Sequence, residues 1–319
     1  MTRAGRYDRL REIELLDPET DHLEIYRLMS MYEFPWDINQ ALSFALFRTY
    51  AVPTIGKLLA ETGEFTERVQ KRYDDTGLIL EAVLEHGFSG TGKDAVRRMN
   101  QMHRSYPISN DDMRYTLCTF VVSPIRWMDA YGWRPFSETE KVASANYYRE
   151  LGRHMGIKDI PATWQEFCEV HDAYERERFG YDPGGRAVAD STLALLCTFP
   201  PNDKAPAALI DAFSRSLMDP HLREAFRYEA PPRWFRALSR AALRLRGRVV
   251  RAMPVRTRPK FVRDLPSIRS YPNGFDVREL GTFPQGCPVP HGRTSAAAAT
   301  DGDTYSDRVV SPQVTPSGA

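Results

Sequence analysis

Helical periodicity constrains the fold of this chain more than any other feature of its sequence. Apolar residues recur every three to four positions in ten segments, and no segment shows the sustained alternation that indicates a strand. The periodic segments are 37–49, 53–61, 64–86, 93–105, 111–131, 137–155, 163–179, 205–217, 220–227 and 233–252. The sequence therefore predicts an all-α protein.

Capping residues mark several of the expected helix ends. Ser137 and Glu140 form a capping box at the start of segment 137–155, and Gly156 follows its last turn. Asn110 precedes two aspartates, which predicts a helix start with an Asn cap and acidic residues facing the helix dipole. These signals support the helix assignment independently of the apolar pattern.

The chain divides into three parts. Residues 1–36 are an N-terminal segment, residues 37–285 form the expected helical domain, and residues 286–319 lack an apolar pattern and are expected to be disordered. Because 42% of the 319 residues are hydrophobic, the chain can bury a sizeable core. We expect a single globular domain.

Cysteine use and hydropathy indicate the compartment. The four cysteines are far apart and form no CxxC pair, which argues against a zinc or disulfide framework and favours a reducing compartment. Residues 1–22 are densely charged and lack the apolar region of a signal peptide. No stretch approaches the roughly 18 uncharged apolar residues that a membrane-spanning helix needs. We expect a cytoplasmic protein without a signal peptide or transmembrane helix.

Three polar side chains lie on the apolar sides of two neighbouring predicted helices. Arg72 comes one turn before Thr76 in segment 64–86, so both point the same way, and His103 follows the apolar positions of segment 93–105. A histidine and a basic–hydroxyl pair that face inward from helical walls are typical of a pocket for a metal or a metallocofactor.

Each of these residues also has a structural interpretation. His103 could be a hydrogen-bonded core histidine. Arg72 could be a surface residue paired with Asp74 or Asp75, and Thr76 could bond back to its own helix. The spacing alone leaves both interpretations open.

Two other motifs fail on inspection. Gly87-x4-Gly92-Lys93 resembles a phosphate-binding loop, but Asp94 replaces the hydroxyl residue that binds magnesium, and a helix rather than a strand precedes it. Glu150-x-x-x-His154 is one residue longer than the motif of di-iron bundles and occurs once. The sequence thus argues against a nucleotide site and a di-iron site.

Several motifs in order resemble one family. They are RTYAVPTIGKLLAETGEF, KRYDDTGLIL, RRMNQMHRSYPISNDDMRYTLCTFVVSPIRW, YGWRPFSETEK and ELGRHMGIKDIPATWQEF, which together run from about residue 48 to 174. Shorter matches follow at 186–192 and 270–282. In these motifs the chain resembles the MpaB-type oxygenases, which are related to the latex-clearing rubber oxygenases.

The resemblance implies an all-α domain that encloses a b-type haem and its iron. His103 occupies the position of the axial ligand, within N-x-x-H-x-x-Y, and Asn100 stands where an arginine often precedes that histidine. The Arg-x-x-Lys-Thr motif of the rubber oxygenases corresponds to Arg72, Asp75 and Thr76, with aspartate in place of lysine. The resemblance thus assigns catalytic roles to these three residues, iron binding to His103, and contact with haem to Arg72 and Asn100.

The resemblance also implies a reaction. A haem-dependent oxygenase of this kind would use dioxygen to cleave a C=C bond in a lipophilic, prenyl-like small molecule. Two alternatives stay open from the residues alone: a haem protein with a peroxidase or monooxygenase activity, and a non-catalytic helical module that binds lipid or protein.

The charge distribution singles out one more segment. Residues 233–263 hold eleven basic residues and no acidic ones, although the whole chain has a net charge of only +1. Within segment 233–252 an apolar stripe from Trp234 to Val249 has arginines beside it, which describes a basic amphipathic helix. The stripe could dock on the acidic body of the protein or make a peripheral membrane contact. The segment shows no nucleic-acid-reading motif, so we expect no nucleic-acid partner.

Overall fold

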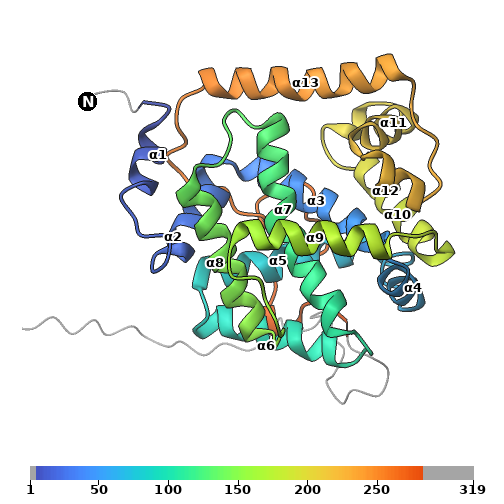
Figure 1. Ribbon diagram of the computed structural model, residues 1–319, viewed down its shortest axis with the longest axis horizontal. Coiled ribbons are helices and arrows are strands. Elements are labelled where there is room, and N and C mark those ends of the chain that lie inside the picture. Colours follow the sequence, from blue (N-terminus) through green and yellow to red (C-terminus); the bar gives the residue numbers. More distant parts are fainter. Residues whose placement is uncertain (1–4, 283–319) are drawn as a thin grey trace, which may run out of the picture. The chain divides into compact units, whose positions relative to one another are not determined.

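Helices build the computed structural model, which describes residues 5–282 and contains no strand in that range (Figure 1). The prediction of an all-α fold is therefore confirmed. The first half contains α1 (Asp8–Ile13), α2 (His22–Arg27), the π-helical turn η1 (Leu28–Glu33), α3 (Pro35–Tyr50), α4 (Pro53–Glu61), α5 (Val69–His86), α6 (Gly90–Arg104) and α7 (Asn110–Tyr131). The second half contains α8 (Glu138–His154), α9 (Trp164–Arg178), α10 (Pro183–Cys197), η2 (Asn202–Lys204), α11 (Ala207–Leu217), α12 (Pro220–Ala225), α13 (Arg233–Ala252) and η3 (Val277–Glu279).

All ten expected helices are present, and three further helices were not expected: α1, α2 and α10. Helix α10 begins at Pro183, within a run of Pro and Gly whose composition predicts a break between helices. In the structure, the Asp182 carboxylate accepts a hydrogen bond from the backbone N–H of Gly185 at 2.8 Å, and Pro183 occupies the first turn. The run is therefore a capped helix start, because proline is tolerated where the backbone N–H would be free anyway.

The caps agree with the sequence in one case and differ in another. The Ser137–Glu140 capping box forms as expected, with reciprocal bonds of 3.3 and 2.7 Å. At the start of α7 the cap is Ser109 rather than Asn110, because the Ser109 hydroxyl accepts the backbone N–H of Asp112 at 3.0 Å. The expected start is thus displaced by one residue.

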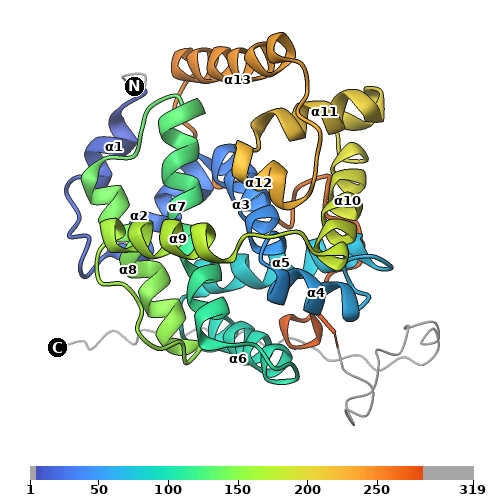
Figure 2. The ribbon, with the colours of Figure 1, turned by 45° about the vertical axis from the view of Figure 1, so that its right-hand side comes forward.

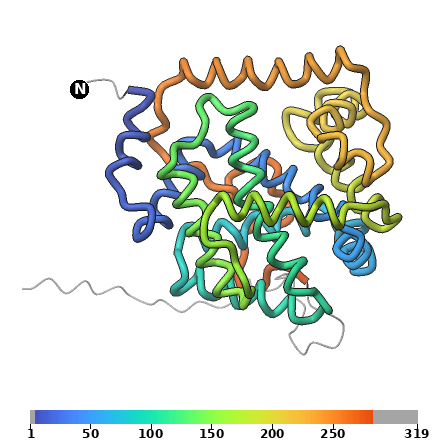
Figure 3. Tube along the Cα trace, viewed as in Figure 1, coloured from blue at the N-terminus to red at the C-terminus, as the bar shows by residue number. Residues whose placement is uncertain are grey.

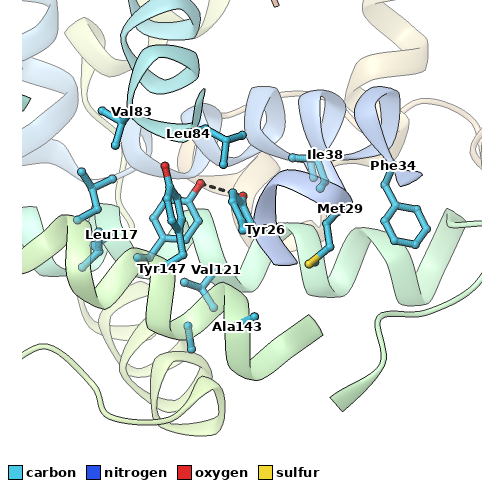
Figure 4. Close-up of a cluster of buried hydrophobic side chains, with 14 of the residues drawn as sticks. Tyr26, Met29, Phe34, Ile38, Val83, Leu84, Leu117, Val121, Ala143 and Tyr147 are labelled. Atoms are coloured by element: carbon cyan, nitrogen blue, oxygen red, sulfur yellow. Dashed lines mark hydrogen bonds between the residues drawn. The ribbon is translucent and has the colours of Figure 1, made fainter. Parts of the chain in front are cut away.

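The core lies where α2, α3, α5, α7 and α8 meet. Helix α7 packs against α3 on one side and α9 on another, α5 packs against α6, and α2 packs against α8 (Figures 2 and 3). Figure 4 shows buried side chains from these helices converging. The Tyr26 and Tyr147 rings stack with their centroids 4.5 Å apart.

The described part of the N-terminal segment, residues 5–36, belongs to the same compact unit as the following helices, since Ile13 and Ile25 are fully buried in the core. The expectation of disorder for residues 286–319 lies outside the described residues.

Helix α4 is held by an unusually close contact with α10. A side chain at Gly56 would meet the Tyr50 carbonyl oxygen at 2.5 Å and the Gly185 Cα atom at 2.6 Å. Only glycine permits this approach. The contact positions the helix that forms one wall of the main cavity.

Helix α13 runs along one edge of the unit, beside α11 and α7, while α6 lies at the opposite edge (Figures 1 and 2). Within residues 5–282, none of the helices combines the length and the apolar character required to cross a bilayer.

Candidate functional site

A cavity of about 740 Å³ brings the three polar residues together. Its walls come from the C-terminal half of α3, from α4, from the N-terminal half of α5, from the C-terminal half of α6 and from parts of α7 and α8. Arg72, Thr76 and His103 all line it. A cavity of this volume lies within the range of cofactor and ligand sites, roughly 300–1,000 Å³.

His103 projects from α6 without a hydrogen-bond partner for its Nδ1 atom among the described residues. Burial lowers the pKa of His103 to about 4, and the Arg72 guanidinium lowers it further as the second cause. The imidazole is therefore neutral near pH 7. The prediction of an inward-facing histidine is confirmed, and the alternative of a hydrogen-bonded core histidine does not fit an unpartnered Nδ1.

Arg72 is a cation in the cavity wall without an ion pair among residues 5–282. Its guanidinium donates to the Thr76 hydroxyl and lies over the Phe65 ring at 4.9 Å. Burial lowers the pKa of Arg72, while Tyr50 opposes this shift as the next cause. The surface pairing with Asp74 or Asp75 does not occur.

Thr76 lines the cavity and also bonds back to its own helix, so both interpretations of this residue apply. Its hydroxyl bonds back to the Arg72 carbonyl oxygen at 2.8 Å and also accepts the bond from the Arg72 guanidinium. The back-bond orients the hydroxyl, so this threonine helps to fix the arginine in the cavity wall.

Most of the remaining wall is apolar and includes Ile55, Leu58, Leu80, Met99, Phe120 and Leu151. Its exposed members include the charged residues Lys57, Glu61, Asp111 and Arg178. The buried Asp112 carboxylate also lines the cavity and accepts the Thr54 hydroxyl at 3.0 Å and the Tyr174 hydroxyl at 2.8 Å, which connects α7 with α4 and α9. The cavity thus offers an apolar interior with one neutral imidazole and one cation.

A second, smaller cavity of about 120 Å³ adjoins the first. The two share a partition formed by Leu46, Thr76, Leu80, Phe120 and Tyr148. Thr76 therefore borders both spaces.

The structure does not bring the other two predicted site residues to the cavity. Asp75 is buried on the flank of α5, where its carboxylate accepts the Tyr271 hydroxyl and the Lys71 ammonium, the latter at 2.7 Å. Asn100 instead donates its amide to the His154 carbonyl oxygen at 2.9 Å, which connects α6 with α8. Each lies three residues from Arg72 or His103, about 60° around its helix, and its side chain binds a partner outside the cavity instead.

The outer side of α5 binds a C-terminal strap, which we define as residues 260–282. The Asp74 carboxylate accepts the backbone N–H groups of Arg269 and Ser270 at 3.0 and 2.8 Å. Glu81 accepts the backbone N–H of Val262 and the Arg263 guanidinium, the latter at 3.0 Å. Burial raises the pKa of Glu81. The strap therefore holds the helix whose opposite side carries Arg72.

The strap also reaches α6. The buried Arg98 guanidinium donates to the carbonyl oxygens of Leu280 and Thr282, at 2.6 Å each, and Thr282 lines the cavity. Burial, with Asp75 as the next cause, raises the pKa of Tyr271, so its hydroxyl stays a donor. Asp75 is thus a residue that anchors the strap.

Sequence reasoning missed two parts of the wall. Tyr50 is fully buried at the end of α3, and burial raises its pKa. Thr282 arrives from the far end of the described chain. Both residues lie within motifs of the family resemblance, but only the packing of distant segments places them at the cavity.

The family model described as "ER-bound oxygenase mpaB/B'/Rubber oxygenase, catalytic domain" matches residues 38–252. The chain belongs to this family. The match contains nearly all of the cavity wall and ends before the strap. The family resemblance predicted from the motifs is confirmed.

Individual members of the family are similar over most of the chain. The chain is 33% identical over 269 residues to the ER-bound oxygenase mpaB' of Penicillium brevicompactum, an alignment that covers 73% of this chain and 62% of the relative. It is 32% identical over 255 residues to the ER-bound oxygenase mpaB of Penicillium roqueforti, covering 70% of this chain and 84% of the relative. The chain thus spans less than two thirds of the Penicillium brevicompactum relative.

Proposed function

We propose that the protein is a haem-dependent oxygenase that binds b-type haem in the 740 Å³ cavity. The observation that carries the proposal is His103, a neutral imidazole with an unpartnered Nδ1 atom in the wall of a large apolar cavity. A neutral imidazole is one of the side-chain donors that bind haem iron in proteins.

The donor set in the described residues fits a haem better than a bare metal ion. Within residues 5–282, no group of three or more His, Cys, Asp or Glu side chains could hold a metal ion. A single histidine suffices for haem, since the macrocycle supplies the other in-plane ligands.

The chain's own residues prepare the cavity for oxidative chemistry. When bound, haem supplies the iron at which dioxygen reacts. Thr76 holds the Arg72 guanidinium in the wall. That guanidinium can stabilise negative charge that develops beside it, commonly worth ~10²–10³ in rate for one well-placed donor. The apolar wall excludes water, which strengthens this electrostatic effect.

The proposed substrate is a lipophilic, prenyl-like small molecule, whose C=C bond is cleaved as both atoms of dioxygen enter two carbonyl products. The apolar wall supports the substrate class, and membership of an oxygenase family supports the reaction type. We also propose a cytoplasmic location, which the free thiols of Cys118, Cys168 and Cys197 support.

Haem titration tests the cofactor. We expect wild-type protein to bind haem in a one-to-one ratio with a Soret band, and His103→Ala to lose this binding while its helical circular dichroism persists. His154→Ala is the matched control, because His154 is a half-exposed helical histidine that stacks on Phe88. Unchanged haem occupancy in His103→Ala would refute the ligand assignment.

Turnover tests the reaction. We expect wild-type protein to consume oxygen and to form carbonyl products from a prenylated compound. The Arg72→Ala variant should retain haem but lose ~10²–10³ in rate. Arg72→Lys keeps the charge without the planar fork and serves as its control. Haem binding without cleavage products would favour a peroxidase or monooxygenase, and absence of haem binding would favour the non-catalytic module.

A further inference from the structure

Helix α13 attaches to the protein by the face opposite its apolar stripe. Its buried residues are Ser239, Leu243 and Gly247, which follow one another at intervals of one turn. A side chain at Gly247 would meet the Tyr131 carbonyl oxygen of α7 at 2.8 Å, so the helix sits very close to the end of α7. Of the two possibilities that the sequence leaves open, docking of the apolar stripe on the body does not occur, because the large residues of the stripe are exposed.

One arginine fastens this attachment. The Arg246 guanidinium pairs with the Asp37 carboxylate of α3 at 2.8 Å and lies over the Trp36 ring at 3.6 Å. Among residues 5–282, Arg246 is the one residue of α13 that takes part in an ion pair. The orientation of the helix is thus set by its inner face.

The outer face carries a continuous exposed apolar stripe. Trp234, Leu238, Leu245, Val249 and Met253 are 68%, 58%, 58%, 56% and 52% exposed. Trp234, Leu238, Leu245 and Val249 follow one another at intervals of four, seven and four residues, which places them on one face of a helix about 30 Å long, and Met253 directly follows the helix end.

A row of arginines borders this stripe. Arg233, Arg244, Arg248 and Arg251 are exposed and lie on one flank of it. No acidic residue occurs anywhere in 233–263, so the positive charge of this row is not neutralised along the helix. An exposed aromatic and aliphatic line beside unpaired arginines is the arrangement of a helix that lies in a bilayer interface.

We propose that the outer face of α13 is a membrane-binding surface for bilayers that contain anionic phospholipids. The apolar stripe enters the boundary between headgroups and acyl chains, and the arginine row contacts lipid phosphates. Charge complementarity and the straight, one-sided stripe favour a bilayer over a protein partner, whose groove would need acidic residues along the same length.

The position of α13 makes this surface a tether rather than a substrate entrance. Helix α7 touches α13 near Tyr131, whereas the cavity is lined by the opposite half of α7, from its cap Ser109 to Phe120. Tyr131 lies eleven residues beyond Phe120, which corresponds to about 16 Å along the helix. The surface therefore acts independently of the proposed haem site.

Co-sedimentation of the full chain with vesicles tests the proposal. We expect binding to vesicles of equal phosphatidylcholine and phosphatidylserine at low salt, and none to phosphatidylcholine alone. Binding should fall sharply as salt approaches 1 M, where the Debye length is ~3 Å. Since each charge near an anionic surface changes partitioning about fivefold, the Arg244→Gln, Arg248→Gln, Arg251→Gln variant should bind roughly a hundredfold more weakly.

Two further variants separate charge from apolar contact. Leu238→Gln with Leu245→Gln should weaken partitioning on the order of a hundredfold at unchanged net charge. A triple variant of exposed arginines elsewhere, Arg11→Gln, Arg97→Gln and Arg153→Gln, removes the same charge and should bind as wild type does. Equal loss in this control would overturn the proposal.

Tryptophan fluorescence provides a test of direct contact with lipid. Brominated lipids in the anionic vesicles should quench tryptophan fluorescence, and Trp234→Phe should remove the quenched part. Wild type that stays in the supernatant at low salt, or that binds duplex DNA or an acidic peptide but no vesicles, would refute the membrane assignment.

Discussion

Lowering the pH should destabilise the haem-free protein through His103. Burial lowers the pKa of this histidine to about 4 in the folded protein, against ~6.5 in the unfolded chain. Between pH 4 and pH 6.5, His103 binds a proton in the unfolded chain but stays neutral in the folded protein. The contribution of His103 to stability is therefore fully present above pH 6.5 and decreases as pH falls towards 4.

The magnitude follows from the shift. A difference of about 2.5 pKa units corresponds to ~3 kcal/mol of unfolding free energy at a pH below both values. At pH 5, His103 is almost fully protonated in the unfolded chain and almost neutral in the folded protein. The unfolding free energy at pH 5 is therefore already ~2 kcal/mol lower than at high pH. His103→Gln cannot take up a proton and should lack this part of the pH dependence.

Urea unfolding at pH 7 and pH 5 measures the effect. The loss of unfolding free energy on going to pH 5 should be ~2 kcal/mol larger in wild type than in His103→Gln, because all other titrating groups are common to both proteins. His86→Gln, a half-exposed helical histidine, is the control and should follow wild type. Parallel behaviour of wild type and His103→Gln would refute a buried, unpartnered imidazole.

Three further predictions concern the supports of the cavity. Asp75→Lys should lower the unfolding free energy by ~3–5 kcal/mol in urea, because it leaves two ammonium groups, with Lys71, in a buried site; a new six-coordinate haem spectrum would contradict the position of this residue outside the cavity. Tyr271→Phe should cost ~1–3 kcal/mol in the same assay by leaving the Asp75 carboxylate short of a donor, and unchanged stability would disprove the role of the strap. Gly56→Ala should lower stability by ~1–3 kcal/mol in a thermal melt because the added methyl group meets Gly185 backbone, whereas an unchanged melt would show that α4 can move away.

The site could be predicted where it depends on one helix at a time. Arg72 and Thr76 share a face because their spacing is one helical turn, and His103 follows the apolar positions of its own helix. Asp75 and Asn100 were assigned to the site by resemblance to a motif. Their side chains leave the cavity face because each is offset on the helix, and because Tyr271 and the His154 carbonyl bind them elsewhere.

For α13, too, the sequence predicts the helix itself, while the tertiary structure decides which face it exposes. Its length, its apolar stripe and its arginines follow from the residues in 233–252. Which face docks depends on Gly247 meeting the end of α7 and on Arg246 meeting Asp37, contacts between segments far apart in the chain. Periodicity predicts that a helix has two faces, but it does not say which one the protein covers.

By itself the sequence determined the all-α class, nearly all helix positions, the family and the inward face of His103, because these depend on spacing within one helix or on motifs in order. The tertiary structure decided the enclosure of the cavity, the burial that keeps His103 neutral, the strap on α5 and the exposed face of α13. These features arise from contacts between segments up to some two hundred residues apart, such as the Tyr271 hydroxyl on the Asp75 carboxylate. Local periodicity carries no information about them.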